Sequence, residues 1–288
     1  MNELEVSIIY AYVSVRPLFT DPMGQLAFQI AFPAADPRYR TLENLGYLCM
    51  KICILHIGHT EPGAVSAHPP SPERFKAGLA PYLPHADWTT ISAVTGTLPQ
   101  PEDYNAYLIT GGKYSVFDTL AWQDRFLDFI GDVISKNIQI IGICYGHQAI
   151  AQVLGGVVER SPRGYGVGLM PVSVVADTSW CQSSEDPLML HAMHQDQVTV
   201  LPEGAEVFLS SDFCPISGFT FNNNVLAIQQ HPDFTCDLNY DLIKKREDRI
   251  GEKTAIAAIA ALEGRDDTAA SVEWMARFLR QQYVLCKS

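Results

Sequence analysis

The sequence lacks the cysteine spacing of a disulfide framework or a zinc module. Its 288 residues include seven cysteines, an odd number, at irregular intervals and without a Cys-x-x-Cys pair. Small secreted domains and zinc modules depend on regular spacing of this kind. The cysteine pattern therefore predicts a protein of the reducing cytoplasm, and nothing in the sequence indicates a metal or an organic cofactor.

Long apolar runs and basic clusters are also missing. No segment approaches the roughly 18 apolar residues that a membrane crossing needs. The apolar segment 6–15 follows acidic residues rather than a basic region, so it makes a poor signal peptide. Lysine and arginine number 20 against 32 acidic residues, which gives a net charge of −12. Phosphate-backbone binders need a basic stripe, so together with the missing apolar run this charge predicts neither a nucleic-acid nor a membrane partner. The cations at 244–246 precede two acidic residues and are typical of a solvated helix face.

The first 49 residues differ in character from the rest. They hold short apolar pieces without a clear period, interrupted or followed by prolines at positions 17, 22, 33 and 37. At Met50 a β-branched run begins that is typical of a buried strand. We therefore expect an irregular N-terminal appendage over residues 1–49, which an over-long start would explain, and one domain over residues 50–288.

Strands and helices alternate between Met50 and Gly156. Strand patterns cover 50–58, 88–94, 106–112 and 139–141, and helical patterns cover 73–80, 122–135 and 149–154. Alternation of this kind predicts an α/β fold with a doubly wound, mostly parallel sheet flanked by helices. Short strand patterns then follow at 157–160, 167–175, 198–201, 207–210, 216–221 and 225–230. They predict an antiparallel edge extension, and helical patterns at 237–251 and 268–283 close the chain.

Cys144 stands at a predicted sharp turn between a strand and a helix. Gly142 and Gly146 flank it, and a Cβ at either position would obstruct a tight turn. A nucleophile between two glycines, after a strand and before a helix, is the arrangement of the nucleophile elbow, here with cysteine in place of serine. The helix N-terminus favours the reactive thiolate. A free cysteine is more commonly a small buried hydrophobe, but here strand, glycines and helix together favour a nucleophile.

A cysteine nucleophile needs a base, and the base needs an orienting group. His231 directly follows the apolar strand pattern 225–228, and strand ends are where open α/β sheets bind ligands. Asp233, two residues on, can accept from the imidazole and fix its tautomer. The motif read alone fits a plain His-Pro-Asp turn equally well.

Other candidates concern substrate binding. The backbone N–H groups of Gly111 or Gly112 and of Tyr145 are placed to stabilise an oxyanion, although paired glycines also form ordinary turns. Gln148 opens the predicted elbow helix, and His194 with Gln195 precedes a strand; these side chains are candidates for a polar pocket.

Four segments together resemble the class I glutamine amidotransferase family. Residues 142–148 resemble its nucleophile motif, 110–116 its oxyanion strand, 194–198 a segment near its substrate pocket, and 229–234 the segment with its catalytic histidine and carboxylate. The similarity runs from about Met50 to the last helical pattern. It implies a Cys144–His231–Asp233 triad that hydrolyses the side-chain amide of glutamine through a γ-glutamyl thioester and releases ammonia to solvent or to an unidentified synthetase subunit.

Two departures qualify this resemblance. The family usually carries Glu where this chain has Asp233, which is one methylene shorter. The chain also has no P-loop for ATP, so it resembles the stand-alone, GMP-synthase-like members. Two alternatives stay open: a γ-glutamyl peptidase acting on γ-glutamyl conjugates, and a non-catalytic binding or regulatory protein on the same scaffold. An α/β-hydrolase fits less well, because its acid precedes its histidine in the chain.

Overall fold

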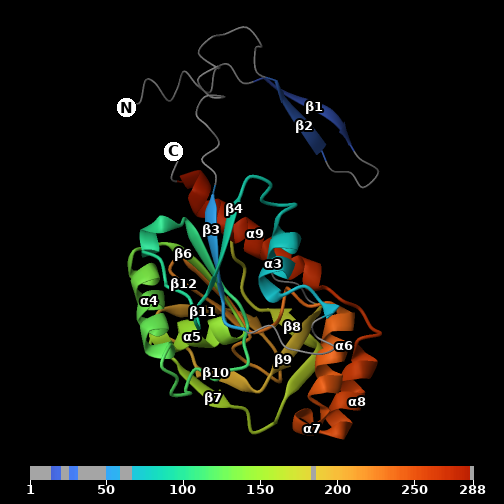
Figure 1. Ribbon diagram of the computed structural model, residues 1–288. Coiled ribbons are helices and arrows are strands. Elements are labelled where there is room, and N and C mark those ends of the chain that lie inside the picture. The colour runs from blue at the N-terminus through green and yellow to red at the C-terminus, as the bar shows by residue number, and fades with distance from the viewer. Residues whose placement is uncertain (1–13, 21–25, 32–49, 59–66, 183–185, 286–288) are drawn as a thin grey trace. The chain divides into compact units, whose positions relative to one another are not determined.

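The computed structural model describes residues 14–20, 26–31, 50–58, 67–182 and 186–285. Contacts within the chain define two units, Met1–Leu48 and Cys49–Ser288. The described part of the first unit is a hairpin in which β1 (Ser14–Thr20) pairs antiparallel with β2 (Leu26–Ala31), with an irregular register between Pro17 and Phe19 (Figure 1). Proline has no N–H group to donate to a β-ladder. The prolines interrupt the strand pattern of this region, and no strand was predicted in it.

The described residues of the second unit form a nine-stranded sheet in the order β4-β3-β5-β6-β13-β12-β11-β8-β9. The first five pair in parallel, and the others pair antiparallel. The parallel strands are β4 (Asp87–Ser92), β3 (Lys51–His56), β5 (Ala106–Ile109), β6 (Gln139–Ile143) and β13 (Val225–Ile228). The antiparallel strands are β12 (Gly218–Phe221), β11 (Ala205–Ser210), β8 (Gly166–Val174) and β9 (Leu188–His194). The predicted α/β fold with an antiparallel extension is confirmed.

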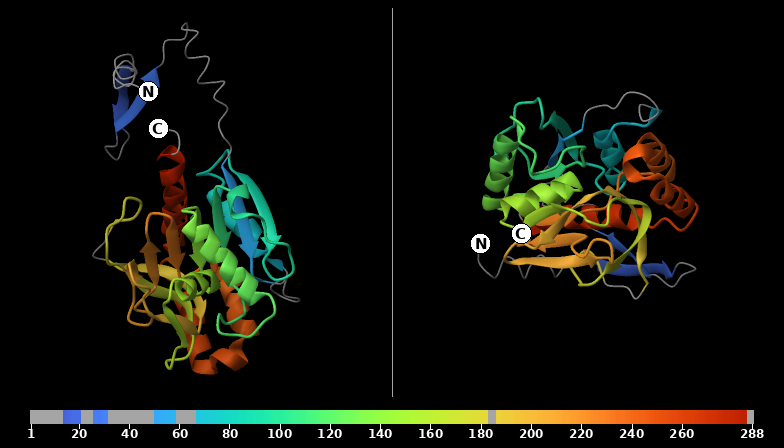
Figure 2. Two further views of the ribbon diagram at one scale, coloured as in Figure 1. Left: turned by 90° about the vertical axis from the view of Figure 1, so that its left-hand side faces the viewer. Right: turned by 90° about the horizontal axis from the view of Figure 1, so that it is seen from below.

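Helices cover both faces of the sheet (Figures 1 and 2). On one face α3 (Ser71–Leu79) and α9 (Thr268–Leu285) pack against Ile52 and Ile54 of β3. On the other, α4 (Gln123–Ser135) and α5 (Tyr145–Val153) join the cluster that contains Cys53 and Leu55. Successive strand residues point to opposite faces, which explains why this strand is apolar throughout. Among the described residues, no helix combines the length and apolar character that a membrane crossing requires.

A third apolar cluster joins the C-terminal helices to β8 and β9. It includes residues of α6 (Cys236–Lys245), α7 (Glu247–Ile250) and α8 (Glu252–Ala261), drawn in orange in Figure 1. The helix expected over 237–251 is interrupted at Arg246, whose N–H is shared between the carbonyls of Leu242 and Ile243. Such tightening is common where a helix ends.

Two elements of this region were not predicted. The strand β9 has the sequence LMLHAMH, which lacks both β-branched residues and polar alternation. The helix α8 is rich in alanine and has no distinct apolar stripe. A shorter two-stranded sheet pairs β7 (Val157–Arg160) with β10 (Asp196–Val200).

Candidate active site

Cys144 occupies a strained turn between β6 and α5. Its backbone angles are φ 51° and ψ −99°, and a non-glycine residue in such a region costs roughly 1–3 kcal/mol. The surrounding backbone enforces the turn. A Cβ on Gly142 would lie 2.5 Å from the carbonyl of Gly146, and the N–H of Cys144 donates to the carbonyl of Ile228 at 2.9 Å. The side chain therefore stands at the N-terminus of α5.

His231 and Asp233 lie in the segment that follows β13. Nδ1 of His231 is 3.2 Å from Oδ1 of Asp233, and the Phe234 ring stacks on the imidazole with a centroid distance of 3.9 Å. The main-chain N–H of His231 donates to the carbonyl of His191 at 2.9 Å. Both candidate catalytic side chains are buried, so packing and hydrogen bonds hold the imidazole in one orientation.

Gly111 lies against both Cys144 and His231. A Cβ at this position would come 2.6 Å from Cε1 of His231 and 3.4 Å from Cβ of Cys144. Burial of the imidazole disfavours its charge, but the Cys144 sulfur and the Asp233 carboxylate outweigh burial and raise the pKa of His231 to about 9. The site therefore favours an imidazolium beside the sulfur at neutral pH.

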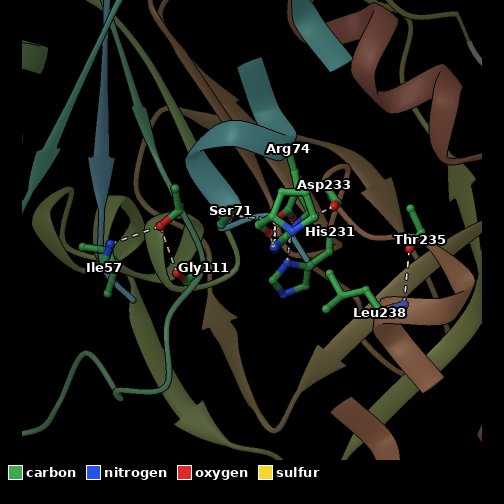
Figure 3. Close-up of polar contacts among 10 residues, drawn as sticks. Ile57, Ser71, Arg74, Gly111, His231, Asp233, Thr235 and Leu238 are labelled. Atoms are coloured by element: carbon green, nitrogen blue, oxygen red, sulfur yellow. Dashed lines mark hydrogen bonds and ion pairs between the residues drawn. The ribbon is translucent and has the colours of Figure 1, made fainter. Parts of the chain in front are cut away.

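The helix α3 supplies two further partners of Asp233, Ser71 and Arg74 (Figure 3). The Ser71 hydroxyl donates to Oδ2 at 2.7 Å, and Nη2 of Arg74 donates to the same oxygen at 2.6 Å. Burial would raise the pKa of Asp233, but the bond from His231 and the charge of Arg74 hold this pKa well below its usual value. Sequence reasoning missed both partners, because they precede Asp233 by about 160 residues and no local pattern connects them to it.

The strand β5 leads into the predicted oxyanion segment, where Thr110 fixes the backbone before Gly111 and Gly112. Its hydroxyl accepts from the N–H of Ile57 at 3.1 Å and donates to the carbonyl of Gly111 at 3.0 Å (Figure 3). A Cβ on Gly112 would lie 2.4 Å from Cγ2 of Ile57. Glycine is thus required at both positions for the backbone to pass this close to the nucleophile.

A pocket of about 410 Å³ opens beside Cys144. Its lining includes the predicted residues Gly112, Tyr145, Gln148, His194 and Gln195. The Gln148 amide donates to the carbonyl of Asp196 at 2.8 Å and to the Gln229 side chain at 3.1 Å, so it braces the pocket wall. Burial lowers the pKa of His194 to about 4, which leaves this ring neutral. His147 packs on Phe219 and is not among the lining residues.

Cations gather around this pocket although the chain as a whole is acidic. Among the described residues that line it are Lys113, Arg160, Arg246 and Arg249, with Asp196 as the carboxylate. Arg160 lies 3.4 Å from Asp196. The expectation of a solvated helix face at 244–246 is wrong for Arg246, because the break after α6 brings this residue to the pocket. Among the described residues, one group of three side chains has the spacing of metal ligands. That group lies outside the pocket.

Comparisons with known proteins identify the family to which the chain is related. Residues 85–246 match the family model of the class-I glutamine amidotransferases. The chain is 30% identical to γ-glutamyl peptidase 4 of Arabidopsis thaliana over 55% of its own length and 66% of that protein, just under two-thirds. It is 29% identical to one subunit of the glutamine-hydrolysing GMP synthase of Sulfolobus acidocaldarius, over 46% of this chain and 69% of that one.

Solved structures show the same fold. A glutamine amidotransferase from Thermotoga maritima superposes with a TM-score of 0.63 at 19% identity, covering 81% of this chain and 99% of the other. At this level of sequence identity, the structural similarity supports a shared fold and nothing further. The family match, however, spans more than half of the chain. The chain therefore belongs to the class-I glutamine amidotransferase family.

Proposed function

We propose that the protein is a cysteine amidase that cleaves γ-glutamyl amides, with glutamine as its first substrate. The observation that carries this proposal is the strained turn at Cys144, with His231 beside it and Asp233 behind His231. A strained backbone in a buried site persists only where the surroundings enforce it, and such strain clusters at active sites.

In the proposed reaction the Cys144 thiolate attacks the side-chain amide carbon of glutamine. The N–H groups of Tyr145 and of Gly111 or Gly112 stabilise the oxyanion. The His231 imidazolium gives its proton to the departing nitrogen, so that ammonia leaves and a γ-glutamyl thioester remains. His231 then accepts a proton from water, which attacks the thioester, and glutamate leaves as the thiolate is restored.

The pocket favours γ-glutamyl peptides as a second substrate class. Its volume of about 410 Å³ and its cations Lys113, Arg160 and Arg249 suit a substrate with more than one carboxylate. Free glutamine offers one carboxylate, whereas a γ-glutamyl peptide adds a second on its leaving group. The similarity to a γ-glutamyl peptidase points in the same direction.

The fate of the ammonia differs between the two activities. One of the relatives is named as a subunit of GMP synthase, and we propose that an amidotransferase role here would require a synthetase subunit to receive ammonia. A peptidase releases an amino compound to solvent and needs no such subunit. We propose a cytoplasmic location for either, since the described cysteines are all free thiols.

The test is an assay of ammonia release from glutamine and of cleavage of a γ-glutamyl peptide panel by the purified chain. We expect Cys144→Ala to abolish turnover, since Cys144 is the one cysteine among the described residues that line the pocket. Cys53→Ala, a core cysteine on β3 outside the pocket, should retain it. Turnover by Cys144→Ala equal to that of the unaltered protein would overturn the proposal.

The substrate panel separates the candidate functions. Cleavage of peptides without release of ammonia from glutamine would identify a peptidase, and the reverse would identify a glutaminase. If neither substrate is turned over and a glutamine-like electrophile fails to label Cys144, the protein is a binding or regulatory member of the family rather than an enzyme.

A further inference from the structure

A second group of reactive side chains lies behind the triad, outside the pocket. His191 comes from β9, Cys236 opens α6, and Asp266 lies in the segment before α9. Nε2 of His191 is 3.2 Å from Oδ2 of Asp266, and Sγ of Cys236 is 3.9 Å from the same oxygen. All three ligand atoms lie within 4.8 Å of one another.

Two of these three separations, those to the Asp266 oxygen, are close to the separations of ligand atoms around a tetrahedral zinc ion. With metal distances of about 2.3 Å to sulfur and 2.0–2.2 Å to nitrogen and oxygen, tetrahedral ligand atoms are roughly 3.4–3.6 Å apart. The nitrogen–oxygen and sulfur–oxygen separations differ from that range by a few tenths of an ångström. Cys236 is only partly buried, and the proposed site requires its side chain to turn so that the sulfur also comes within ligand spacing of Nε2 of His191.

We propose that His191, Cys236 and Asp266 bind Zn²⁺ or a divalent ion of similar softness. Thiolate, imidazole and carboxylate together are the ligand set that zinc takes in proteins, whereas Mg²⁺ and Ca²⁺ prefer oxygen alone. The Asp266 side chain is 33% exposed, so the fourth position is open to water and the ion is exchangeable. Binding releases the thiol proton of Cys236 to solvent.

The neighbouring residues are arranged as a zinc site requires. The fully buried Asn239 amide faces Nδ1 of His191 at 3.0 Å. Its Oδ1 atom is buried without a hydrogen-bond partner among the described residues. Turning the amide over places Oδ1 where it accepts from Nδ1–H, so the Asn239–His191 hydrogen bond is kept while Nε2 exchanges its bond to Asp266 for the metal. The other oxygen of Asp266 accepts from the N–H of Thr268 at 2.9 Å, so the carboxylate is already oriented.

The site would connect metal binding to the catalytic segment. The carbonyl of His191 accepts the N–H of His231, and Cys236 follows Asp233 by three residues. An ion here would hold β9, the start of α6 and the segment before α9 together behind the triad. The inference does not depend on which substrate the triad cleaves.

The experiment measures zinc binding to the whole chain in a Cys144→Ala background, which removes a competing thiol. Zinc stoichiometry and affinity are followed by competition with a chromogenic chelator, and Co²⁺ is added to look for the charge-transfer band of a cobalt thiolate. We expect one equivalent of zinc and that band. We also expect a higher melting temperature with zinc, because binding to the native state stabilises it.

Variants assign the ion to these residues. Cys236→Ser should remove the cobalt band and weaken zinc binding at least about 100-fold, and Asp266→Asn should weaken it about 10- to 100-fold. Asp237→Asn is the matched control, since Asp237 is the neighbouring exposed carboxylate in the first turn of α6, and it should bind zinc as the background does. Absence of the cobalt band in the background protein, or equal zinc affinity in the Cys236→Ser and Asp237→Asn proteins, would overturn the proposal.

Discussion

At the scale of single residues, the acid of the proposed triad is one methylene shorter than the glutamate that the family usually carries. Asp233 reaches the imidazole at 3.2 Å despite its missing methylene. Ser71 and Arg74 both bind its other oxygen, so the carboxylate is fixed from the far side and turned toward His231. A buried carboxylate with these partners stays ionised. The substitution of Asp for the family's usual Glu is therefore compatible with a working triad in this geometry.

The raised pKa of His231 predicts how activity depends on pH. The imidazolium must be present to protonate the leaving nitrogen, so kcat/KM should fall as the pH rises through about 9. Asp233→Asn removes one of the interactions that raise this pKa and should move the alkaline limit to lower pH. The measurement is a pH profile of kcat/KM. Ser71→Ala, which keeps the carboxylate charge, serves as the control and should leave the limit closer to that of the unaltered protein.

The same shift has a consequence for stability. A histidine whose pKa is raised on folding stabilises the native state below its unfolded value of about 6.5, and this contribution is lost as the pH rises through the folded value. Stability from the Cys144–His231 contact is therefore lost on the alkaline side.

For the activity profile, an alkaline limit of kcat/KM that is the same in the Asp233→Asn protein and in the unaltered protein would show that this carboxylate does not control the pKa of the imidazole.

At the scale of elements, α8 approaches β8 closely enough to determine the residue beneath it. Gly168 has φ +83°, and a Cβ there would lie 2.7 Å from the carbonyl oxygen of Ala258. This contact positions the α6–α8 group, which carries Arg246 and Arg249 to the pocket. A glycine in a strand pattern is consistent with such a close backbone approach.

Gly168→Ala should destabilise the protein through this contact. The left-handed backbone alone costs about 1–2 kcal/mol for a residue with a Cβ, and the collision with α8 should add about 1–3 kcal/mol. Gly155→Ala separates the two effects, because Gly155 has φ +88° but no atom of the described residues lies within 4 Å of its Cβ position. Urea denaturation of both variants measures the loss of unfolding free energy. Equal losses in the two variants would mean that α8 moves away from the added Cβ at no energetic cost.

At the scale of the whole molecule, the boundary near Met50 predicts a self-sufficient fragment. Met50 belongs to the core cluster of α3 and α9, and its carbonyl accepts the N–H of Asp87 at 2.8 Å. A cut before Met50 preserves these contacts. We propose that residues 50–288 fold and act without the first 49.

The fragment 50–288 should unfold within about 1 kcal/mol of the whole chain, a change of about 2–4 °C in melting temperature. Its turnover on the best γ-glutamyl substrate should match that of the whole chain. Calorimetry and the same activity assay provide the measurement. A fragment that is unfolded, or folded but inactive, would show that the first 49 residues contribute to the domain.

Much of the fold follows from patterns that are local in the chain. The apolar run of β6, the glycines around Cys144 and the start of α5 are contiguous, so steric limits and hydrophobic periodicity predict the elbow directly. The same holds for α4, whose buried residues recur at helical spacing. Where side chains are small or unbranched, as in α8 and β9, the periodicity carries little information and the elements were missed.

The sequence by itself determined the alternating α/β order, the turn at Cys144 and the segments that hold its expected partners, because each depends on residues near one another in the chain. Only the tertiary structure decided what meets those segments. The sheet order places β13 beside β6, which brings His231 to Cys144, while α3 brings Arg74 to Asp233. Contacts between residues far apart in the chain depend on how strands are ordered and helices packed, and no local propensity specifies that.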